Sequence, residues 1–390
     1  MASAQHSASG LPASARSSEE RLAILQLIRS RRVGAVTFHR LMAEHGSAAA
    51  ALAALPGIAA GAGVENYAVC PPAVALAEMR AARAAGAQML CHGDPAYPAA
   101  LATLADAPPV IWLRGDAGLL ARPMVALVGA RNASSLGLRM ARRLAETLAE
   151  AGFVIVSGLA RGIDAEAHRA ALDHGTLGVV AGGVDIAYPP ENAGLMADMA
   201  RLGCVLSEQP PGLEPQARHF PLRNRIIAGL SRAVVVVEAA ARSGSLITAK
   251  DAADLGREVF AVPGHPFDAR AAGCNQLIRD GATLVRSAAD VVEALGAVAS
   301  PAAQGHLGFH EMALRGGATA VPPAAPRARP LRDIAALHRL ILDRLSPSPV
   351  PEDQLIRDLQ VSAAEVTPHL LMLELEGQLC RQPGGMISRP

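Results

Sequence analysis

Seven short apolar runs between residues 123 and 295 constrain the fold of this chain more than any other feature. Most are rich in β-branched residues, and amphipathic stretches with a helical period alternate with them. Continuous apolar runs are typical of parallel strands buried on both faces, and their alternation with helices is typical of α/β proteins. We therefore predict a doubly wound α/β core. Its predicted strands are Val125–Gly129, Phe153–Ser157, Thr176–Ala181, Cys204–Ser207, Ala233–Val237, Glu258–Val262 and Thr283–Val285.

A helical segment precedes this core. The Ala-rich pattern from Glu19 to about Arg83 predicts small helices, with turns at Val33-Gly34, His45-Gly46-Ser47 and Leu55-Pro56-Gly57-Ile58. Glycine permits the tight turns of such paired helix hairpins. Hairpins of this kind either bind DNA phosphates through backbone N–H groups or serve only to pack the helices together. After a loop region, Val110–Gly115 is predicted as an edge strand that enters the main domain.

A third unit follows the core. Residues 296–330 have the Pro, Ala, Gly and Arg composition of a linker. Three predicted helices and a hairpin then follow in the order of a winged helix: Leu331–Leu345, Glu352–Leu359, Ala363–Glu376, and the strands Gln378–Arg381 and Met386–Ser388. The predicted organisation is a disordered tail (1–18), a helical domain (19–85), the core (86–295), the linker (296–330) and the winged helix (331–390).

The composition limits the classes of function. With 36 basic against 35 acidic residues the formal charge is +1, so a polyanion site must come from local clustering of charge. The five cysteines are scattered and never form a C-x-x-C pair, which predicts no disulfide framework, no metal site and a reducing, cytoplasmic location. Charged residues interrupt every apolar stretch before the roughly 18 to 20 residues that a membrane helix needs, so we expect no membrane span.

Two strand-to-helix junctions carry features of anion sites. The first, Val128–Gly137, places Arg131 and Ser134 where a helix N-terminus presents free N–H groups. It lacks the G-x-G-x-x-G pattern, and no acidic residue ends the second strand to bind a ribose, so we expect no dinucleotide. We expect no cofactor of another kind. The second junction contains Ser157, Gly158 and Arg161.

Two polar residues follow the second junction, Asp164 and His168. They are open to two interpretations. They form either a buried capping network or a catalytic acid/base pair.

Two further segments complete the candidate site. Arg223, Asn224 and Arg225 lie between an aromatic residue and an apolar helix, a placement that favours phosphate or base contacts. Phe220 is either a surface for base stacking or a core residue. Ser243-Gly244-Ser245 at a predicted helix start would cradle a phosphate oxygen. All these junctions lie at the carboxyl ends of predicted parallel strands, where open α/β sheets bind ligands.

These motifs resemble the DNA processing protein A family (DprA, also called Smf), as do Tyr188-Pro189-Pro190-Glu191-Asn192, Val262-Pro263-Gly264 and the run Gly273–Ala282. The resemblance covers about residues 20–295, and the segment 331–390 is similar to the family's winged helix. It implies a SAM-like helical N-terminal domain, an extended Rossmann core and a homodimer through that core. It also implies loading of the RecA recombinase onto incoming single-stranded DNA in natural transformation. The sequence itself has no Walker lysine loop, no G-x-S-x-G elbow and no H-E-x-x-H motif, so we expect no enzymatic activity and no cofactor.

The same resemblance assigns site residues. Carried over by motif, the residues that line the DNA pocket are Arg131, Ser134, Ser157, Gly158, Arg161, Arg223, Asn224, Arg225, Ser243, Gly244 and Ser245. Asn275, Ile278 and Leu284 fall where the family's dimer contact lies.

The segment 331–390 departs from a DNA-binding pattern. It has six Arg and no Lys against eight acidic residues, and the expected recognition helix carries Glu365, Glu374 and Glu376 with His369. Because an acidic helix is repelled by a phosphate groove, we predict that this domain mainly packs or contacts protein.

Two alternative functions are weighed against DNA binding. A phosphoribohydrolase acting on nucleoside monophosphates would use Glu238 on a ribose, but such enzymes carry P-G-G-x-G-T where this chain has Arg242-Ser243-Gly244-Ser245. A protein-only scaffold would show no salt-dependent affinity for oligonucleotides.

Overall fold

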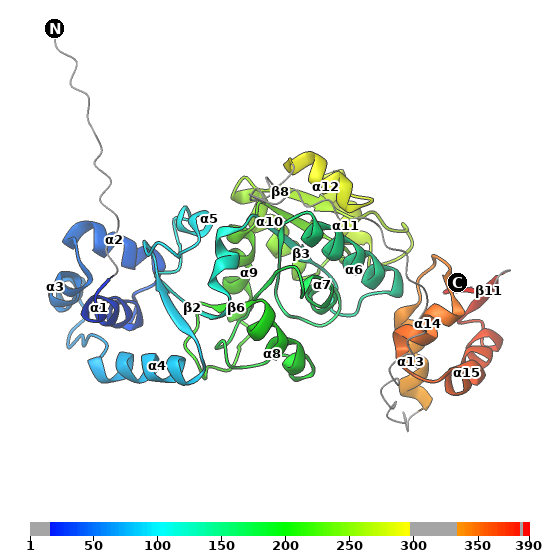
Figure 1. The fold of residues 1–390 in the computed structure, drawn as a ribbon, viewed down its shortest axis with the longest axis horizontal. Helices are drawn as coiled ribbons and strands as arrows, with labels where there is room; N and C mark the ends of the chain where they lie inside the picture. Colours follow the sequence, from blue (N-terminus) through cyan, green and yellow to red (C-terminus); the bar gives the residue numbers. More distant parts are fainter. Residues whose placement is uncertain (1–15, 297–333, 383–384) are drawn as a thin grey trace, which may run out of the picture.

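The computed structural model describes residues 16–296, 334–382 and 385–390 (Figure 1). A helical part, a large mixed α/β part and a small C-terminal part follow one another along the long axis of the molecule. Most of the predicted tail and nearly all of the predicted linker lie outside the described residues, and the domain boundaries stay a prediction. Within the described ranges, no helix combines the length and apolar character needed to cross a membrane.

Four helices form the N-terminal part: α1 (Ser18–Arg29), α2 (Ala35–His45), α3 (Ala48–Gly61) and α4 (Pro72–Ala84). Ser17 and Glu20 form a capping box at the start of α1, and Gly46 ends α2 in the left-handed conformation, as the turn signals predict. The predicted turn at residues 55–58 is wrong, because α3 continues through Pro56. Leu55 and Ala59 on either side of Pro56 are both buried, and their packing outweighs the one missing hydrogen bond.

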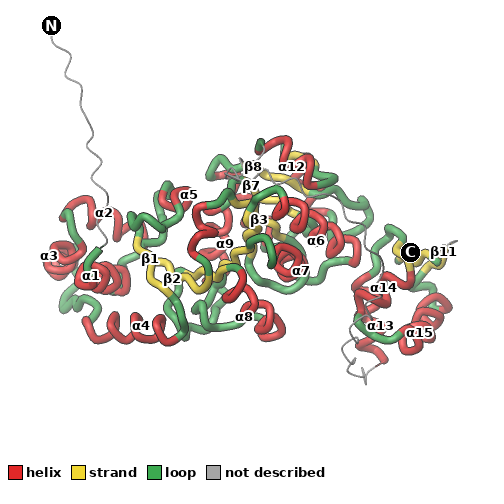
Figure 2. The backbone as a smooth tube through the Cα atoms, in the orientation of Figure 1, coloured by secondary structure: helices red, strands yellow, loops and turns green. Residues whose placement is uncertain are grey.

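A nine-stranded sheet forms the centre of the molecule (Figure 2). Its order is β1-β2-β6-β5-β4-β3-β7-β8-β9; the pairs from β6 to β9 are parallel and those of β1 and β2 are antiparallel. The strands are β1 (Gln88–Cys91), β2 (Val110–Gly115), β3 (Met124–Val128), β4 (Val154–Ser157), β5 (Thr176–Val179), β6 (Cys204–Ser207), β7 (Ala233–Val236), β8 (Glu258–Ala261) and β9 (Thr283–Leu284).

The predicted doubly wound core is thus confirmed, with one strand missed. The edge strand is β1, which pairs with β2 in the register Gln88↔Leu113, so β2 is not at the edge. The run Gln88–Cys91 is short and has no β-branched residue, which is why its sequence reads as loop.

Helices cover both faces of the sheet. Successive residues of β3 point to opposite faces: Val125 and Leu127 join an apolar core with α6 and α7, whereas Ala126 and Val128 join a second core with α9. From β3 the chain runs outward through β4, β5 and β6 and returns to β7 on the other side. A topological switch point therefore lies between β3 and β7. The helices are α5 (Ala99–Ala102), α6 (Ser135–Glu150), α7 (Ile163–Ala171), α8 (Ala193–Leu202), α9 (His219–Leu230), α10 (Ser245–Asp254), α11 (Ala272–Arg279) and α12 (Ala288–Leu295).

The C-terminal part is a winged helix, as predicted. Helices α13 (Ile334–Arg344), α14 (Glu352–Leu359) and α15 (Ala363–Leu375) pack on a small sheet of order β10-β12-β11. The strands are β10 (Val350–Pro351), β11 (Cys380–Gln382) and β12 (Met386–Ser388); β10 was not predicted.

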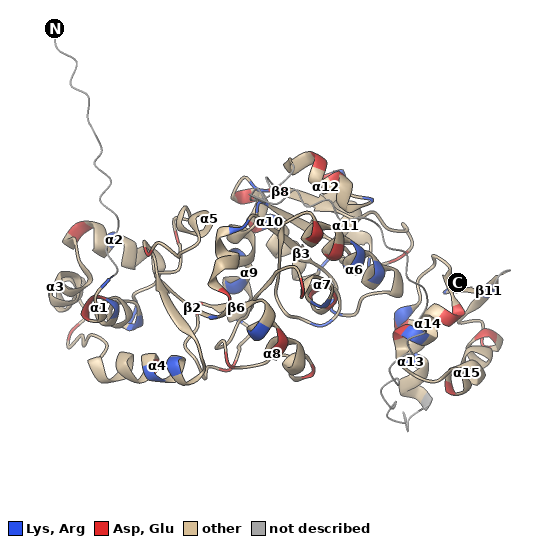
Figure 3. Cartoon of the chain, in the orientation of Figure 1, with Lys and Arg blue, Asp and Glu red and all other residues tan. Residues whose placement is uncertain are grey.

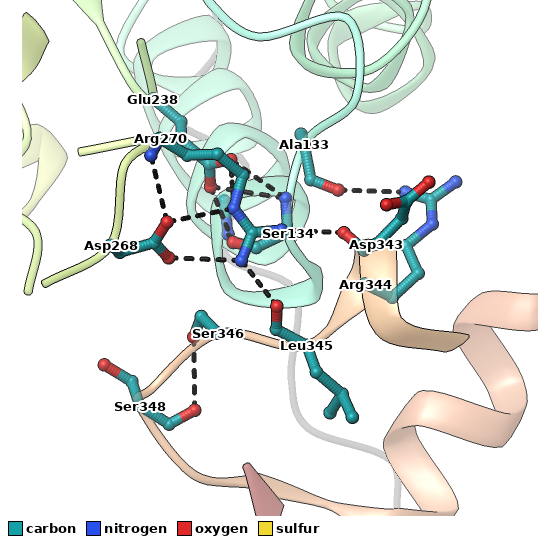
Figure 4. A network of polar contacts seen from close by, with 11 residues as sticks. Ala133, Ser134, Glu238, Asp268, Arg270, Asp343, Arg344, Leu345, Ser346 and Ser348 are labelled. Carbon is teal, nitrogen blue, oxygen red and sulfur yellow. Dashed lines mark hydrogen bonds and ion pairs between the residues drawn. The ribbon is translucent and has the colours of Figure 1, made fainter. Parts of the chain in front are cut away.

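The winged helix contacts the core directly (Figure 4). Arg270 donates hydrogen bonds to the backbone carbonyls of Asp343 (2.7 Å) and Leu345 (2.5 Å). Arg344 donates to the carbonyl of Ala133 (3.2 Å), and Leu136 of α6 packs against the winged-helix core. The winged helix thus packs against the core, as we predict. That it binds duplex DNA weakly stays a prediction.

Candidate nucleic-acid interface

A hollow of about 710 Å³ lies beside the switch point, at the carboxyl ends of β3 and β7. Its walls come from the loop after β3, from α9 and from the loop after β7. A smaller adjoining hollow includes the turn after β4. Together they bring nine predicted site residues to one place: Arg131, Gly158, Arg161, Phe220, Arg223, Asn224, Ser243, Gly244 and Ser245. We call these two joined hollows the switch-point pocket.

Phe220 stands between two cations in this pocket. Its ring centroid lies 5.4 Å from the guanidinium carbon of Arg131 and 6.0 Å from that of Arg223. The ring of Tyr188, itself 46% exposed, lies 5.7 Å away. Phe220 is partly exposed and belongs to none of the apolar cores, so its position fits a stacking surface better than core packing.

Arg223 is the buried cation of the pocket. Its Nη1 donates to the carbonyl of Val179 (2.7 Å), while its Nε has no hydrogen-bond partner in the described part of the chain. Burial lowers the pKa of Arg223 to about 10, against the opposing effect of Asp164. The side chain is therefore cationic at neutral pH. A buried positive charge at the base of a concave site attracts a phosphate strongly, because little water screens it.

Asp164 and His168 form a structural network beneath the turn after β4. The carboxylate of Asp164 accepts hydrogen bonds from the backbone N–H groups of Gly158 (3.1 Å) and Ala160 (3.4 Å), and burial raises its pKa. Burial, and then the charge of Arg223, lower the pKa of His168 to about 3, and its Nδ1 lies 2.7 Å from Thr176 Oγ1. A neutral buried imidazole bonded to a strand supports the capping interpretation over an acid/base pair.

The loop after β7 forms the opposite wall. Ser243 Oγ and Ser245 Oγ lie 2.7 Å apart, and the amide of Asn224 reaches the carbonyl of Gly244 at 3.5 Å. Helix α10 begins at Ser245, so its free N–H groups face this region. The neighbouring Arg242 is exposed and also lines the pocket. Arg242 is not among the predicted site residues, although its position directly before Ser243-Gly244-Ser245 indicates a place in the site.

Three predicted site residues do not line the pocket. Ser134 is buried, caps α6 through the N–H of Gly137 (3.0 Å), and donates to Glu238 (2.6 Å) beside a separate cavity of about 250 Å³. Ser157 is buried and donates to the carbonyl of Leu127 (2.6 Å). These hydroxyls satisfy buried polar groups, which ties them to the interior.

Arg225 is the third predicted site residue that does not line the pocket. Its guanidinium pairs with Glu208 (2.8 Å) and with Asp106 (3.3 Å). Residues two apart on a helix point in nearly opposite directions, so Arg223 and Arg225 cannot serve the same side of α9.

Two of the predicted dimer residues, Asn275 and Ile278, lie on α11, and the third, Leu284, lies on the edge strand β9. The side-chain amide of Asn275 bonds both the N–H (3.2 Å) and the carbonyl (3.0 Å) of Gly264. Ile278 packs partly buried against the core, and Leu284 is 41% exposed on β9.

A helical part, a doubly wound core and a winged helix follow one another along the chain, and arginines line the pocket at the switch point. This arrangement defines a multidomain α/β protein with a candidate anion site. The sequence matches the family model described as DNA recombination-mediator protein A over residues 88–296. It also matches the DprA-like N-terminal HHH domain over 18–81 and the DprA winged helix domain over 322–385. The chain belongs to the DNA recombination-mediator protein A family.

Known proteins agree with this membership. Protein Smf of Synechocystis sp. is 37% identical over 324 residues, which cover 77% of this chain and 80% of that protein. DNA processing protein DprA of Streptococcus pneumoniae is 47% identical over 201 residues, or 51% of this chain and 71% of that protein. The solved structure of the S. pneumoniae protein has a TM-score of 0.52 and 35% identity, and covers 67% of this chain and 98% of that one.

A second solved structure is that of DNA processing protein A from Helicobacter pylori, which was studied for its single-stranded DNA binding mode. It has a TM-score of 0.50 and 30% identity, and covers 54% of this chain and 95% of that one.

Proposed function

We propose that this chain binds single-stranded DNA in the switch-point pocket, protects incoming DNA, and loads the RecA recombinase in natural transformation and homologous recombination. The observation that carries the proposal is the convergence of Arg131, Arg161 and Arg223 around Phe220. Guanidinium groups suit phosphate oxygens, and an exposed aromatic ring suits an unpaired base. The H. pylori relative, whose single-stranded DNA binding mode was studied, supports the same ligand class.

The pocket favours single strands over duplex. It is a concave site with one aromatic wall, and stacking on that wall needs a base that is free of a helical partner. Bases in a duplex are already stacked and paired. Arg131, Gly158, Arg161, Arg223, Asn224, Ser243, Gly244 and Ser245 are the proposed contacts, with Arg242 added.

Assembly and location extend the proposal. The exposed Leu284 lies on the edge strand β9, and Asn275 and Ile278 lie on α11, the helix that precedes β9 in the chain. A second copy docked on this edge would form a homodimer through the core. RecA is the proposed protein partner.

All five cysteines are free, four of them buried, which fits a reducing cytoplasm.

The enzymatic alternative loses support from the position of Glu238. Its carboxylate accepts hydrogen bonds from the backbone N–H and the hydroxyl of Ser134 (3.0 and 2.6 Å), and burial raises its pKa. Glu238 lines the separate 250 Å³ cavity and not the switch-point pocket. A nucleotide bound among the arginines would therefore not meet this carboxylate.

A paired aromatic substitution tests the proposal. We expect Phe220→Ala to weaken oligo-dT binding by about 1–3 kcal/mol through lost base stacking. Phe267→Ala removes an aromatic ring that is 88% exposed and lies outside the pocket, and should leave the affinity unchanged. Fluorescence anisotropy gives the affinities, and RecA assembly on the same strands gives the loading activity. Equal affinity of both variants and wild type would refute the pocket assignment.

A further inference from the structure

A second basic groove lies between the core and the winged helix. It has a volume of about 720 Å³ and is lined from α6 and α7 on one side and from α13 and α14 on the other. Among the residues that the structure describes, seven arginines line it against four carboxylates, although the whole chain has a formal charge of only +1. Figure 3 shows basic residues on α6 and, in the winged-helix domain, beside α14. The groove thus concentrates positive charge in an almost neutral protein.

Three of these arginines have largely exposed side chains. Arg142 and Arg169 are 60% and 53% exposed, and both pair with the one carboxylate of Glu166, which is only 10% exposed beneath them. A single carboxylate cannot neutralise two guanidinium groups, so the cluster keeps an excess positive charge. On the facing wall, the side chain of Arg357 is 62% exposed and forms a solvent-exposed ion pair with Asp353 (3.0 Å).

The groove is continuous with the switch-point pocket. Arg131 and Arg161 line both, and both side chains are exposed. A chain of phosphates that leaves the pocket past these two arginines therefore enters the groove without crossing an uncharged surface.

The contacts of the winged helix hold the second wall in place. Arg270 lines the switch-point pocket and donates to the last carbonyls at the end of α13, and Arg344 of α13 lines the groove while donating to the carbonyl of Ala133. The groove is lined by α13 and α14 and by no described residue of the acidic helix α15. The acidic recognition helix thus does not oppose a polyanion at this place.

We propose that the backbone of a single strand bound in the switch-point pocket continues through this groove, so that α6, α7 and the α13–α14 face of the winged helix form a second, sequence-independent phosphate track. This inference rests on the proposed function. The winged helix then binds DNA through the side of its helices rather than through its recognition helix.

The length of the oligonucleotide tests the track. A strand of about six thymidines fills the pocket alone, whereas one of about 20 also reaches the groove. The double variant Arg139→Ala/Arg357→Ala removes one cation from each wall. We expect it to bind the long strand about tenfold more weakly, with a salt slope flatter by about 1.4, or roughly 0.7 for each lost phosphate contact. Its affinity for the short strand should equal that of wild type.

Two matched variants complete the design. Arg201→Ala/Arg286→Ala removes the same charge from exposed ion pairs outside the groove, and should bind the long strand like wild type. The pair Arg139→Gln/Arg357→Gln removes the two charges but keeps the first three side-chain carbons of each residue. Loss of long-strand binding in this variant as well argues that the lost charges, and not lost packing, are the cause. Equal long-strand binding by the groove variant and the matched control would overturn the phosphate track. If wild type bound neither strand, or if Arg223→Ala bound the short strand normally, the proposed function itself would fail.

Discussion

The guanidinium of Arg223 occupies the space that a side chain on residue 158 would need. A Cβ built on Gly158 collides with both terminal nitrogens of Arg223, which is held there by its hydrogen bond to the carbonyl of Val179. The glycine in the turn after β4 is therefore required by a cation that arrives from α9, 65 residues further along the chain. This pair connects two of the walls of the switch-point pocket.

Gly158→Ala should displace Arg223 and reduce both stability and DNA binding. We expect a loss of about 1–3 kcal/mol in the free energy of unfolding, typical of overpacking at a buried site. Gly194→Ala is the matched control, because no atom of the described part of the chain lies within 4 Å of a Cβ built at this position, which is in the first turn of α8. Urea unfolding and anisotropy measure the two effects, and a Gly158→Ala variant as stable as wild type would show that Arg223 moves freely.

Arg225→Ala should destabilise the protein without changing how DNA binding depends on salt. Arg225 pairs with Glu208, and burial raises the pKa of that carboxyl while Arg225 opposes the rise. Removing the cation leaves a poorly solvated carboxylate, at a cost of about 2 kcal/mol. The double variant Arg225→Ala/Glu208→Gln should recover part of this loss. A flatter salt slope in Arg225→Ala would instead place Arg225 on the DNA.

His168 should make the fold sensitive to acid. Its pKa is lowered from 6.5 to about 3 in the folded protein, so below pH 6.5 the unfolded chain takes up a proton that the folded chain does not. The contribution of His168 to the free energy of unfolding is fully present above pH 6.5. As the pH falls from 6.5 to 3, the free energy of unfolding decreases by about 1.4 kcal/mol per pH unit. His168→Gln should show a correspondingly shallower slope in denaturant unfolding between pH 6 and 4. Parallel slopes would mean that His168 titrates normally.

Arg270→Ala should loosen the winged helix from the core. The guanidinium of Arg270 holds the end of α13 through two backbone carbonyls and is itself oriented by Asp268 (3.1 Å). Arg270→Lys should behave similarly, since an ammonium group cannot match this forked geometry. We expect faster hydrogen exchange of the amides around residue 345 and a larger radius of gyration. The exposed Arg286→Ala serves as control, and unchanged exchange in the Arg270 variants would assign the docking to Leu136 instead.

The fold was largely predictable because its signals are local. Most of the parallel strands are short runs of mainly apolar residues, and the winged helix follows from its helix and hairpin order. The strand β1 and the helical course of Pro56 were missed because pairing with β2 and burial of Leu55 and Ala59 are tertiary effects. The site was predictable as a set of loops, since strand ends converge at a switch point. The direction of each side chain could not be predicted from the sequence. Arg223 bonds to Val179 and Arg225 pairs with Glu208, and neither partner is close to its arginine in the sequence.

The measurement that tests the central claim most directly is the affinity of wild type and Arg223→Ala for oligo-dT and for duplex DNA at several salt concentrations. The switch-point pocket predicts that wild type binds the single strand more tightly than the duplex. Its affinity for the single strand should fall steeply with salt, and Arg223→Ala should flatten the slope by about 0.7, the equivalent of one phosphate contact. Salt-independent binding, or the same slope in wild type and Arg223→Ala, would contradict it.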